Sequence, residues 1–355
     1  MCWQFFVSSS LAFSRQYLFV NRQTDKHIRV IFVLYHTVNN YSDGDIMVDL
    51  HGRDLLTLQD FTSEEIYFIL QTALDLKRKQ KRNEPHKLLE GKALGMIFQK
   101  PSTRTRVSFE MAMHQLGGTA IYLGWKDLQL GRGETIADTA RVLSRYVDGI
   151  MARVFSHNDL IELAKYSKVP VINGLSDMYH PCQILADLLT ILEKKGSLKG
   201  IKLTYVGDGN NVCNSLLIGA TKMGMNIFVA TPQGYEPPKE VIDLALANSK
   251  KSGSTVKILN DPIEAVKNAD VIYTDVWVSM GMEEEKEKRM KVFPPYQVNQ
   301  KLLSHAKDDV IVMHCLPAHR GLEITDDVID GKHSVVWDEA ENRLHAQKAL
   351  LALTL

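Results

Sequence analysis

The chain has few cysteines, no net charge and no long apolar run, and each scarcity excludes a class of protein. Its four cysteines are Cys2, Cys182, Cys213 and Cys315. They form no C-x-x-C pair, so neither a disulfide framework nor a zinc knuckle fits, and we expect a reducing compartment. Lys plus Arg equals Asp plus Glu at 42 each, so no net charge recruits nucleic acid or a membrane surface. No stretch reaches the ~18 to 20 unbroken apolar residues of a membrane span. The expected partners are small molecules or other copies of the chain.

Residues 1–46 differ in composition from the rest. Their opening, MCWQFFVSSSLAFSRQYLFVNRQ, has no acid, several serines and two arginines, as a mitochondrial transit peptide would. The alternative is a true start at Met47, because MVDLHGRDLLTLQDFTSEEI looks like the opening of a compact domain. We favour this alternative, with residues 1–46 as a start-site artefact or a disordered tail. With a start at Met47 we expect a cytoplasmic protein, whereas a transit peptide would direct the protein to the mitochondrial matrix.

From Thr62 onward, short apolar runs alternate with helical patterns. Thr62 and Glu65 make a capping box that opens the first helix. The expected strands lie at residues 94–98, 119–123, 149–153, 169–172, 201–206, 226–230, 255–259, 271–274, 310–313 and 334–337. Strands that alternate with helices form parallel sheets covered by helices. We therefore expect an α/β fold of two doubly wound parallel-sheet domains with the active site in the cleft between them.

The run QILADLLTILEKKG falls between the two series of strands and is expected to link the domains. We place the first domain at 47–180 and the second at 181–337, and expect a C-terminal helix at 338–355 that returns to the first domain. In such sheets ligands bind at the carboxyl ends of the strands. The polar segments that follow strands are STRTR after 98, Arg153 after 152, GDGNN after 206, Asp275 after 274 and HCLP after 313.

The segment STRTR, at residues 102–106, suits an anion. It stands where an expected strand gives way to a helix, so free backbone N–H groups and the helix dipole favour negative charge. Hydroxyls and a forked guanidinium add the contacts that a phosphate accepts. The alternative is an N-cap serine followed by two solvated arginines.

A dinucleotide site is the competing interpretation of GDGNN. Gly207 and Gly209 supply G-x-G after a strand, which would suit an NAD-dependent oxidoreductase. However, Val212 occupies the third glycine position, and the next strand ends in VATPQG without the acid that holds a ribose hydroxyl. The pattern thus fails two of its own requirements. A catalytically silent interaction protein is a third alternative.

Four motifs occur together in the order and approximate spacing of the aspartate and ornithine carbamoyltransferases. They are STRTR at 102–106, HPCQ at 180–183, DVWVSMG at 275–281 and HCLPAHRG at 314–321. The chain resembles this family over about residues 47–355, and two of the motifs, D-x-x-x-S-M-G and H-C-L-P, resemble its ornithine branch. The resemblance implies transfer of the carbamoyl group of carbamoyl phosphate to the δ-amine of L-ornithine, giving L-citrulline and phosphate, with no metal or organic cofactor. A related amine such as putrescine is the alternative acceptor, and the direction, arginine biosynthesis or catabolism, stays open.

The resemblance also implies which residues form the site. Those for carbamoyl phosphate are Ser102, Thr103, Arg104, Thr105, Gln129, Arg153, His180, Pro181, Cys182, Gln183, Cys315, Leu316 and Arg343. Those for ornithine are Asn211, Asp275, Ser279 and Met280, and the catalytic set is Arg104, Arg153, His180, Asp275 and Cys315. Asp275, Cys315 and the leaving phosphate are the alternatives for the group that takes the proton of the δ-amine.

Two further expectations come with the resemblance. Family members extend the loop that holds Gln129 into a neighbouring subunit's site, which implies a homotrimer or a multiple of trimers. The peptide bond between Leu316 and Pro317 is expected to be cis, because that isomer costs little before proline and would aim the Leu316 carbonyl inward.

Overall fold

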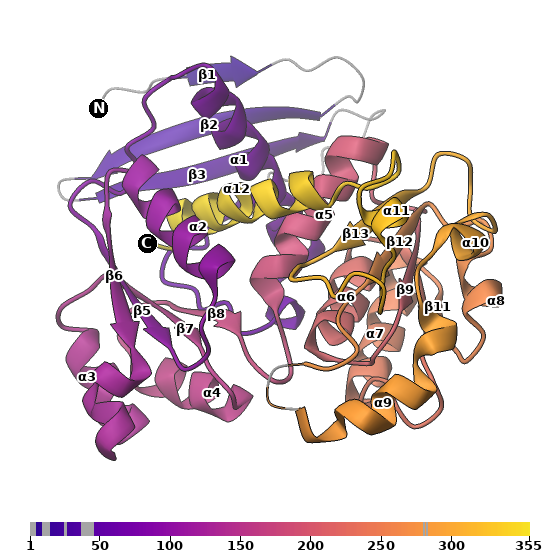
Figure 1. The fold of residues 1–355 in the computed structure, drawn as a ribbon. Helices are drawn as coiled ribbons and strands as arrows, with labels where there is room; N and C mark the ends of the chain where they lie inside the picture. The colour runs from indigo at the N-terminus through magenta and orange to yellow at the C-terminus, as the bar shows by residue number, and fades with distance from the viewer. Residues whose placement is uncertain (1–4, 9–14, 25–26, 37–45, 280, 282) are drawn as a thin grey trace.

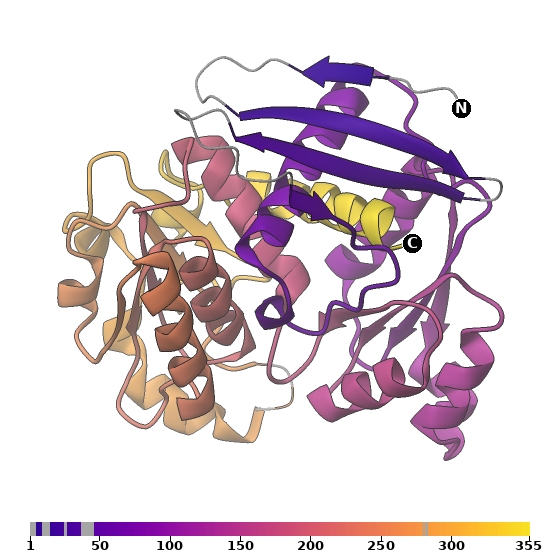
Figure 2. The same cartoon turned by 180° about the vertical axis from the view of Figure 1, so that it is seen from behind.

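The computed structural model describes residues 5–8, 15–24, 27–36, 46–279, 281 and 283–355. Two parallel sheets lie at the centre of two lobes, each with helices packed around it (Figures 1 and 2). The first sheet has the order β6-β5-β7-β8 and consists of β5 (Ala93–Phe98), β6 (Thr119–Gly124), β7 (Gly149–Arg153) and β8 (Val171–Leu175). The second has the order β11-β10-β9-β12-β13. Its strands are β9 (Lys202–Val206), β10 (Asn226–Ala230), β11 (Val256–Leu259), β12 (Val271–Thr274) and β13 (Ile311–His314). The expected α/β class of two parallel sheets is confirmed.

Helices connect the strands, as their apolar spacing predicts. In the first half of the chain they are α1 (Ser63–Lys81), α2 (Thr103–Gln115), α3 (Ile136–Leu143), α4 (His157–Tyr166) and α5 (Pro181–Lys195). In the second half they are α6 (Asn211–Lys222), α7 (Lys239–Ser252), α8 (Pro262–Val266), α9 (Lys286–Val292), α10 (Gln300–Leu303), α11 (Asp326–Ile329) and α12 (Val336–Thr354). Thr62 and Glu65 make the expected capping box of α1. No helix of the described residues is long and apolar enough to cross a membrane.

The C-terminal helix α12 joins the two halves of the molecule. It packs against α1, α2 and α5, and Figure 1 shows it lying across the top of the junction between the lobes. Most of its residues are buried, including polar ones such as Asn342, Gln347 and Lys348. Because buried polar groups need hydrogen-bond partners, this helix carries much of the polar network between the lobes.

Two segments differ from the expectations above. Residues 334–337 are not a strand: only Ser334 makes an isolated bridge to Val312, and Val336 already begins α12. The apolar run is short and continues into a helical pattern, so its side chains serve the first turn of a helix instead.

The second segment is residues 1–46, for which we expected a start-site artefact, a disordered tail or a targeting segment and predicted no strand. The described part of this segment forms antiparallel strands β1 (Phe5–Ser8), β2 (Arg15–Thr24) and β3 (His27–His36), and β3 pairs with β4 (Ile46–Val48). The physical reason is composition, because HIRVIFVLYH and RQYLFV are rich in β-branched and aromatic residues. Figures 1 and 2 show this sheet at one edge of the molecule, above α12 and away from the two parallel sheets.

Candidate active site

A cavity of about 470 Å³ brings together the segments that follow the strands of both sheets. It is lined by Lys100, Pro101, Ser102, Thr103, Arg104, Thr105, Arg153, Leu175, His180, Asn211, Val212, Asp275, Val276, Val278, Ser279, Cys315, Leu316, Pro317, His319 and Arg343. These residues come from the carboxyl ends of β5, β7, β8, β12 and β13, from the N-termini of α2, α5 and α6, and from α12. The site is therefore built where parallel sheets usually bind ligands.

The N-terminus of α2 forms one wall of the cavity. Ser102 is its N-cap, and the Ser102 hydroxyl oxygen accepts a hydrogen bond from the Thr105 backbone N–H at 3.2 Å. Arg343 reaches this turn from α12 and donates to Thr105 Oγ1 at 3.3 Å. The free N–H groups of the turn thus face the cavity beside a guanidinium from the far end of the chain, an arrangement that suits an anion.

Positive charge is concentrated on this wall. No carboxylate of the described chain forms an ion pair with Arg104, Arg153 or Arg343. Burial, together with the charges of Arg343 and Arg104, lowers the pKa of Arg153 to about 9. Arg153 Nε and His180 Nδ1 are buried without a hydrogen-bond partner among the described residues. Because such groups are normally satisfied, the wall has unused capacity for an oxyanion and a polarised oxygen.

His180 stands at the N-cap of α5, and its backbone N–H donates to Ser215 Oγ at 2.8 Å. Burial and the nearby charges of Arg343, Arg153 and Arg104 lower the pKa of its imidazole well below the usual value. The ring is therefore neutral at pH 7 and can donate one hydrogen bond to an oxygen in the cavity.

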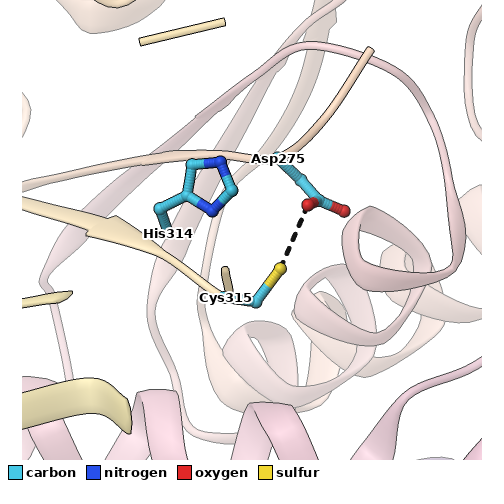
Figure 3. Close-up of side chains that lie close together, drawn as sticks. All are labelled: Asp275, His314 and Cys315. Atoms are coloured by element: carbon cyan, nitrogen blue, oxygen red, sulfur yellow. Dashed lines mark hydrogen bonds between the residues drawn. The ribbon is translucent and has the colours of Figure 1, made fainter. Parts of the chain in front are cut away.

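The opposite wall carries Asp275 and Cys315, which Figure 3 shows side by side. The Cys315 thiol donates to Asp275 Oδ1 at 3.1 Å, and Asn210 Nδ2 donates to Asp275 Oδ2 at 2.8 Å. Burial raises the pKa of Cys315 well above its usual value, and the negative charge of Asp275 raises it further. Cys315 is therefore a protonated thiol at neutral pH. The peptide bond between Leu316 and Pro317 is cis, as expected.

Asp275, His314 and Cys315 place ligand-type atoms within 4.8 Å of one another, but the trio does not fit a metal ion. His314 Nδ1 accepts a hydrogen bond from the Leu316 backbone N–H at 2.9 Å, and its Nε2 lies 3.1 Å from Glu323 Oε1. Both ring nitrogens are thus engaged by protein groups. The two contacts of the His314 ring fix the turn that carries Cys315.

Some predicted site residues lie outside the cavity wall. Pro181, Cys182 and Gln183 are buried in the first turn of α5, where Gln183 Oε1 accepts from Arg343 at 2.7 Å. Gln129 begins a short 3₁₀ turn after β6, away from this chain's cavity. Met280 lies outside the described residues.

Sequence reasoning missed Lys100 and His319, which both line the cavity. Both belong to segments already singled out, since Lys100 precedes PSTRTR and His319 lies within HCLPAHRG. Lys100 Nζ lies 4.4 Å from the ring centroid of Phe155. The available signal was a charged or ionisable side chain directly beside a motif at a strand end.

The glycines of GDGNN serve backbone packing. A Cβ on Gly209 would lie 2.4 Å from Pro237 N, and the Gly209 N–H donates to the Tyr235 carbonyl oxygen at 2.9 Å. The loop after β10 therefore closes on the turn that a dinucleotide's pyrophosphate would occupy. This geometry disfavours the oxidoreductase alternative.

Comparison with known proteins gives the class of the chain. Residues 53–193 match the carbamoyl-P binding domain of aspartate/ornithine carbamoyltransferases, and residues 199–354 match the Asp/Orn binding domain of the same enzymes. The chain therefore belongs to the aspartate/ornithine carbamoyltransferase family. The division between the two matches lies at the end of α5, whereas we placed it at the start of that helix.

Individual relatives narrow the assignment to one branch. The ornithine carbamoyltransferase of Pyrococcus horikoshii is 67% identical over 310 residues, which cover 87% of this chain and 98% of the relative. The protein named "Ornithine carbamoyltransferase, anabolic" from Pyrococcus furiosus is 66% identical over the same length. A solved structure of ornithine carbamoyltransferase from Pyrococcus furiosus superposes with a TM-score of 0.85 at 66% identity, covering 86% of this chain and 98% of that one. Within the family, the chain is an ornithine carbamoyltransferase, and neither putrescine transfer nor NAD-dependent oxidation is favoured by these matches.

Proposed function

We propose that the two walls of the cavity divide the two substrates between them. The phosphate of carbamoyl phosphate lies at the N-terminus of α2, with Arg104 and Arg343. Arg153 and neutral His180 donate to the carbamoyl oxygen, where negative charge grows during attack. The observation that carries this proposal is the cluster of three arginines, unpaired by any described carboxylate, facing Asp275 across one cavity.

Ornithine occupies the wall formed by the segments after β9, β12 and β13. Asp275 accepts from the ammonium of its amino-acid end, and Asn211 and Ser279 contact the same end. Asn211 lines the cavity while its Nδ2 donates to the Ser176 carbonyl oxygen at 2.6 Å, so its side chain is held in place before substrate arrives. This arrangement points the δ-amine toward the carbamoyl carbon.

The reaction forms a bond between the δ-nitrogen and the carbamoyl carbon and breaks the bond from that carbon to the phosphate oxygen. The amine must first lose a proton, and holding an alkylamine with a pKa near ~10.4 neutral at pH 7 costs about 4 to 5 kcal/mol. Cys315 already holds its own proton and is no base. That first proton leaves to solvent before attack. Because Asp275 is engaged by Cys315 and Asn210, the departing phosphate takes the second proton, which the δ-nitrogen releases as its bond to the carbamoyl carbon forms.

An assay of citrulline formation tests the proposed function. Purified protein with carbamoyl phosphate is offered ornithine or aspartate, and binding of radiolabelled carbamoyl phosphate is compared with binding of NAD. We expect citrulline from ornithine, no product from aspartate, and saturable binding of carbamoyl phosphate alone. Binding of NAD without carbamoyl transfer would contradict the proposal.

We further propose that the active form is a homotrimer in which Gln129 reaches the cavity of a neighbouring copy. Support comes from an exposed apolar face on α2 and the edge strand β6, made of Val107, Met111, Ile121 and Tyr122. Gln129 follows this strand within a few residues. The chain has a mass of 40.1 kDa. Light scattering should give three times this mass, or a multiple of the mass of the trimer.

The direction and place of the reaction belong to the same proposal. The relative from Pyrococcus furiosus is named anabolic, which supports a biosynthetic direction for this chain. The relatives compared above come from archaea, which supports the cytoplasm as the place of action. Measured kcat/KM values for citrulline formation and for the reverse reaction would test the biosynthetic direction.

A further inference from the structure

Gln183 lies directly beneath the anion wall, and two carboxyl groups set the orientation of its amide. Gln183 Nε2 donates to Asp187 Oδ1 at 2.8 Å and to Glu339 Oε1 at 3.0 Å. Both hydrogens of the amide nitrogen are thereby used. The amide oxygen then faces Arg343, which donates to it at 2.7 Å. The two carboxyls therefore decide which end of the amide Arg343 meets.

Asp187, on α5, and Glu339, on α12, are fully buried and lie beside each other, because both accept from the same Gln183 amide nitrogen. Burial raises the pKa of Asp187 to about 7 and raises that of Glu339 well above its usual value. The other polar groups that face the pair are Gln183 from α5, Arg343 from α12, Tyr273 from β12 and the backbone at His314 on β13. Two buried carboxyls in contact do not both ionise, so the pair shares one proton at neutral pH.

The hydrogen-bond donors around the pair favour Asp187 as the group that holds this proton, because three donors face Glu339 and one faces Asp187. Glu339 Oε1 accepts from the Tyr273 hydroxyl at 3.1 Å as well as from Gln183, and Glu339 Oε2 accepts from the His314 backbone N–H at 2.9 Å. Asp187 Oδ2, by contrast, receives no N–H or O–H from the described residues. An oxygen that carries a proton needs an acceptor, and Glu339 is the carboxylate beside it.

We propose that Asp187 and Glu339 are positioning residues, a carboxyl pair sharing one proton that fixes the Gln183 amide and through it aims Arg343 at the phosphate. Neither carboxyl lines the cavity, and the proposal rests on the proposed function of that cavity. Arg343 is held between Gln183 Oε1 and Thr105 Oγ1. If the amide turned over, its N–H groups would face the guanidinium, and Arg343 Nη1 would lose the acceptor that it has at Gln183.

Because the proton lies on Asp187, the isosteric variants Asp187→Asn and Glu339→Gln should differ in their kinetic constants. Asp187→Asn keeps an oxygen for Gln183 and supplies an N–H in place of the Oδ2 proton, so we expect kinetic constants within about 3-fold of wild type. Glu339→Gln replaces a carboxylate oxygen by an amide N–H, and this N–H meets groups that are themselves donors, namely Gln183, Tyr273 and the His314 backbone. Gln183 then loses its fixed orientation, and the KM for carbamoyl phosphate should rise roughly 10- to 100-fold. The kcat and the KM for ornithine should stay within about 3-fold, because the lost contact serves the bound phosphate throughout the reaction.

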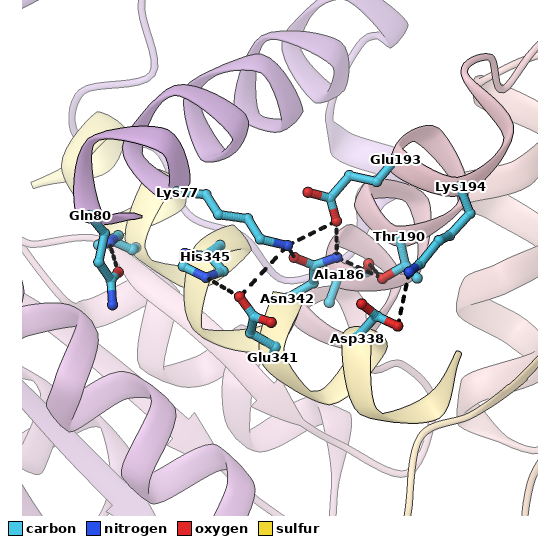
Figure 4. Close-up of polar contacts among 11 residues, drawn as sticks. Lys77, Gln80, Ala186, Thr190, Glu193, Lys194, Asp338, Glu341, Asn342 and His345 are labelled. Carbon is cyan, nitrogen blue, oxygen red and sulfur yellow. Dashed lines mark hydrogen bonds and ion pairs between the residues drawn. The ribbon is translucent and has the colours of Figure 1, made fainter. Parts of the chain in front are cut away.

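A third variant and a control separate positioning from folding. Asp187→Ala removes one acceptor of the Gln183 amide, and we expect a rise in the same KM of roughly tenfold. Glu193→Gln is the matched control, because Glu193 also joins α5 to α12 but lies in the cluster of Lys77 and Asn342, to which it is bonded at 2.9 and 2.8 Å (Figure 4). It should lower the melting temperature without changing either KM.

Each outcome decides something different. A wild-type protein that forms no citrulline contradicts the proposed function itself. An active wild type whose Glu339→Gln and Asp187→Ala variants keep the normal KM for carbamoyl phosphate overturns the positioning role. Loss in Asp187→Asn with retention in Glu339→Gln would place the proton on Glu339 and overturn that assignment. Should Glu339→Gln fail to fold, the comparison of Asp187→Asn with Asp187→Ala still decides both points.

Discussion

Asp208 and Arg289 form an ion pair of 2.9 Å in which both side chains are almost fully buried. The pair joins the GDGNN turn after β9 to helix α9. The same guanidinium donates to the Trp277 carbonyl oxygen and to Glu285 Oε2, each at 2.8 Å. One side chain thus holds both ends of the segment between residues 277 and 285, which carries Ser279 of the cavity wall.

We predict that Asp208→Asn weakens ornithine binding and stability together. Removing one charge of a buried pair leaves the other underpaired, and with Glu285 still present we expect a loss of roughly 2 to 4 kcal/mol in the free energy of unfolding. The KM for ornithine should rise roughly tenfold because Ser279 loses its anchorage. Steady-state kinetics and urea unfolding measure the two effects.

The matched control for this variant is Asp138→Asn, which breaks an exposed ion pair with Arg141 of 2.8 Å on α3. Its effect on stability should stay below about 1 kcal/mol. Equal losses in the two variants, or an unchanged KM for ornithine in Asp208→Asn, would show that the buried pair does not hold the segment.

The two arginines of STRTR should differ strongly in their contribution to catalysis. Arg104 lines the cavity, whereas Arg106 pairs with Glu110 at 3.0 Å and stacks on Tyr122 at 4.1 Å. Arg104→Leu leaves a phosphate dianion underpaired, a loss of roughly 2 to 5 kcal/mol in transition-state binding. That is about 30-fold to several thousand-fold in kcat/KM for carbamoyl phosphate, and it should persist at saturating ornithine.

Arg106→Leu is the neighbouring control, and its kcat/KM should remain within about 3-fold of wild type. Because Arg106 lies at the exposed apolar face of α2 and β6, the oligomeric state of the Arg106→Leu variant is measured together with its kinetics. Near-normal carbamoyl phosphate kinetics in Arg104→Leu, with loss in Arg106→Leu, would contradict the assignment of the anion contact.

Sequence patterns predicted the parts of this molecule that local chemistry determines. Nine of the ten expected strands are present, and most of them are buried strands, which occur in the sequence as short apolar runs. The residues directly after those strands could be predicted to converge, because all strand ends of a parallel sheet meet at one edge. The Ser102 cap and the pairing of Arg106 with Glu110 are likewise local consequences of spacing.

Contacts between distant segments escaped the same reasoning. Glu339 meets Gln183 across 156 residues, and Asp187 lies on an apolar helix where an acid has no obvious partner. Nothing in a linear pattern states that α12 returns these groups to α5. The strands within residues 1–46 were likewise not predicted, although β-branched and aromatic residues follow one another there.

Stability should rise with pH above neutrality because of Lys348. This lysine is buried, and its Nζ donates to Gln80 Oε1 at 2.6 Å and to Gln115 Oε1 at 2.9 Å, with no carboxylate partner among the described residues. Burial lowers its pKa to about 8. Between pH 8 and the unfolded value near ~10.4 the unfolded chain binds more protons than the folded one, so raising the pH favours folding.

The test compares wild type with Lys348→Met in denaturant unfolding at pH 7.5 and pH 10. The free energy of unfolding of the wild type should gain on that of the variant as the pH rises, because only the wild type carries the cost of a buried ammonium at lower pH. A difference between the two proteins that is constant across this range would show that Lys348 has an ordinary pKa in the folded state.

Ornithine should be preferred over putrescine by roughly 10⁴ in kcat/KM, because putrescine lacks the α-carboxylate and leaves polar groups of the site unpaired. Asn211 is the residue that makes this prediction specific, since it lines the cavity with its amide already bonded to the Ser176 carbonyl oxygen. Asn211→Ala should lower kcat/KM for ornithine and leave that for putrescine within about 3-fold, so the ratio narrows. Measured rates with both amines at fixed carbamoyl phosphate decide the matter. Comparable kcat/KM for the two amines in the wild type would contradict the placement of ornithine's amino-acid end against this wall.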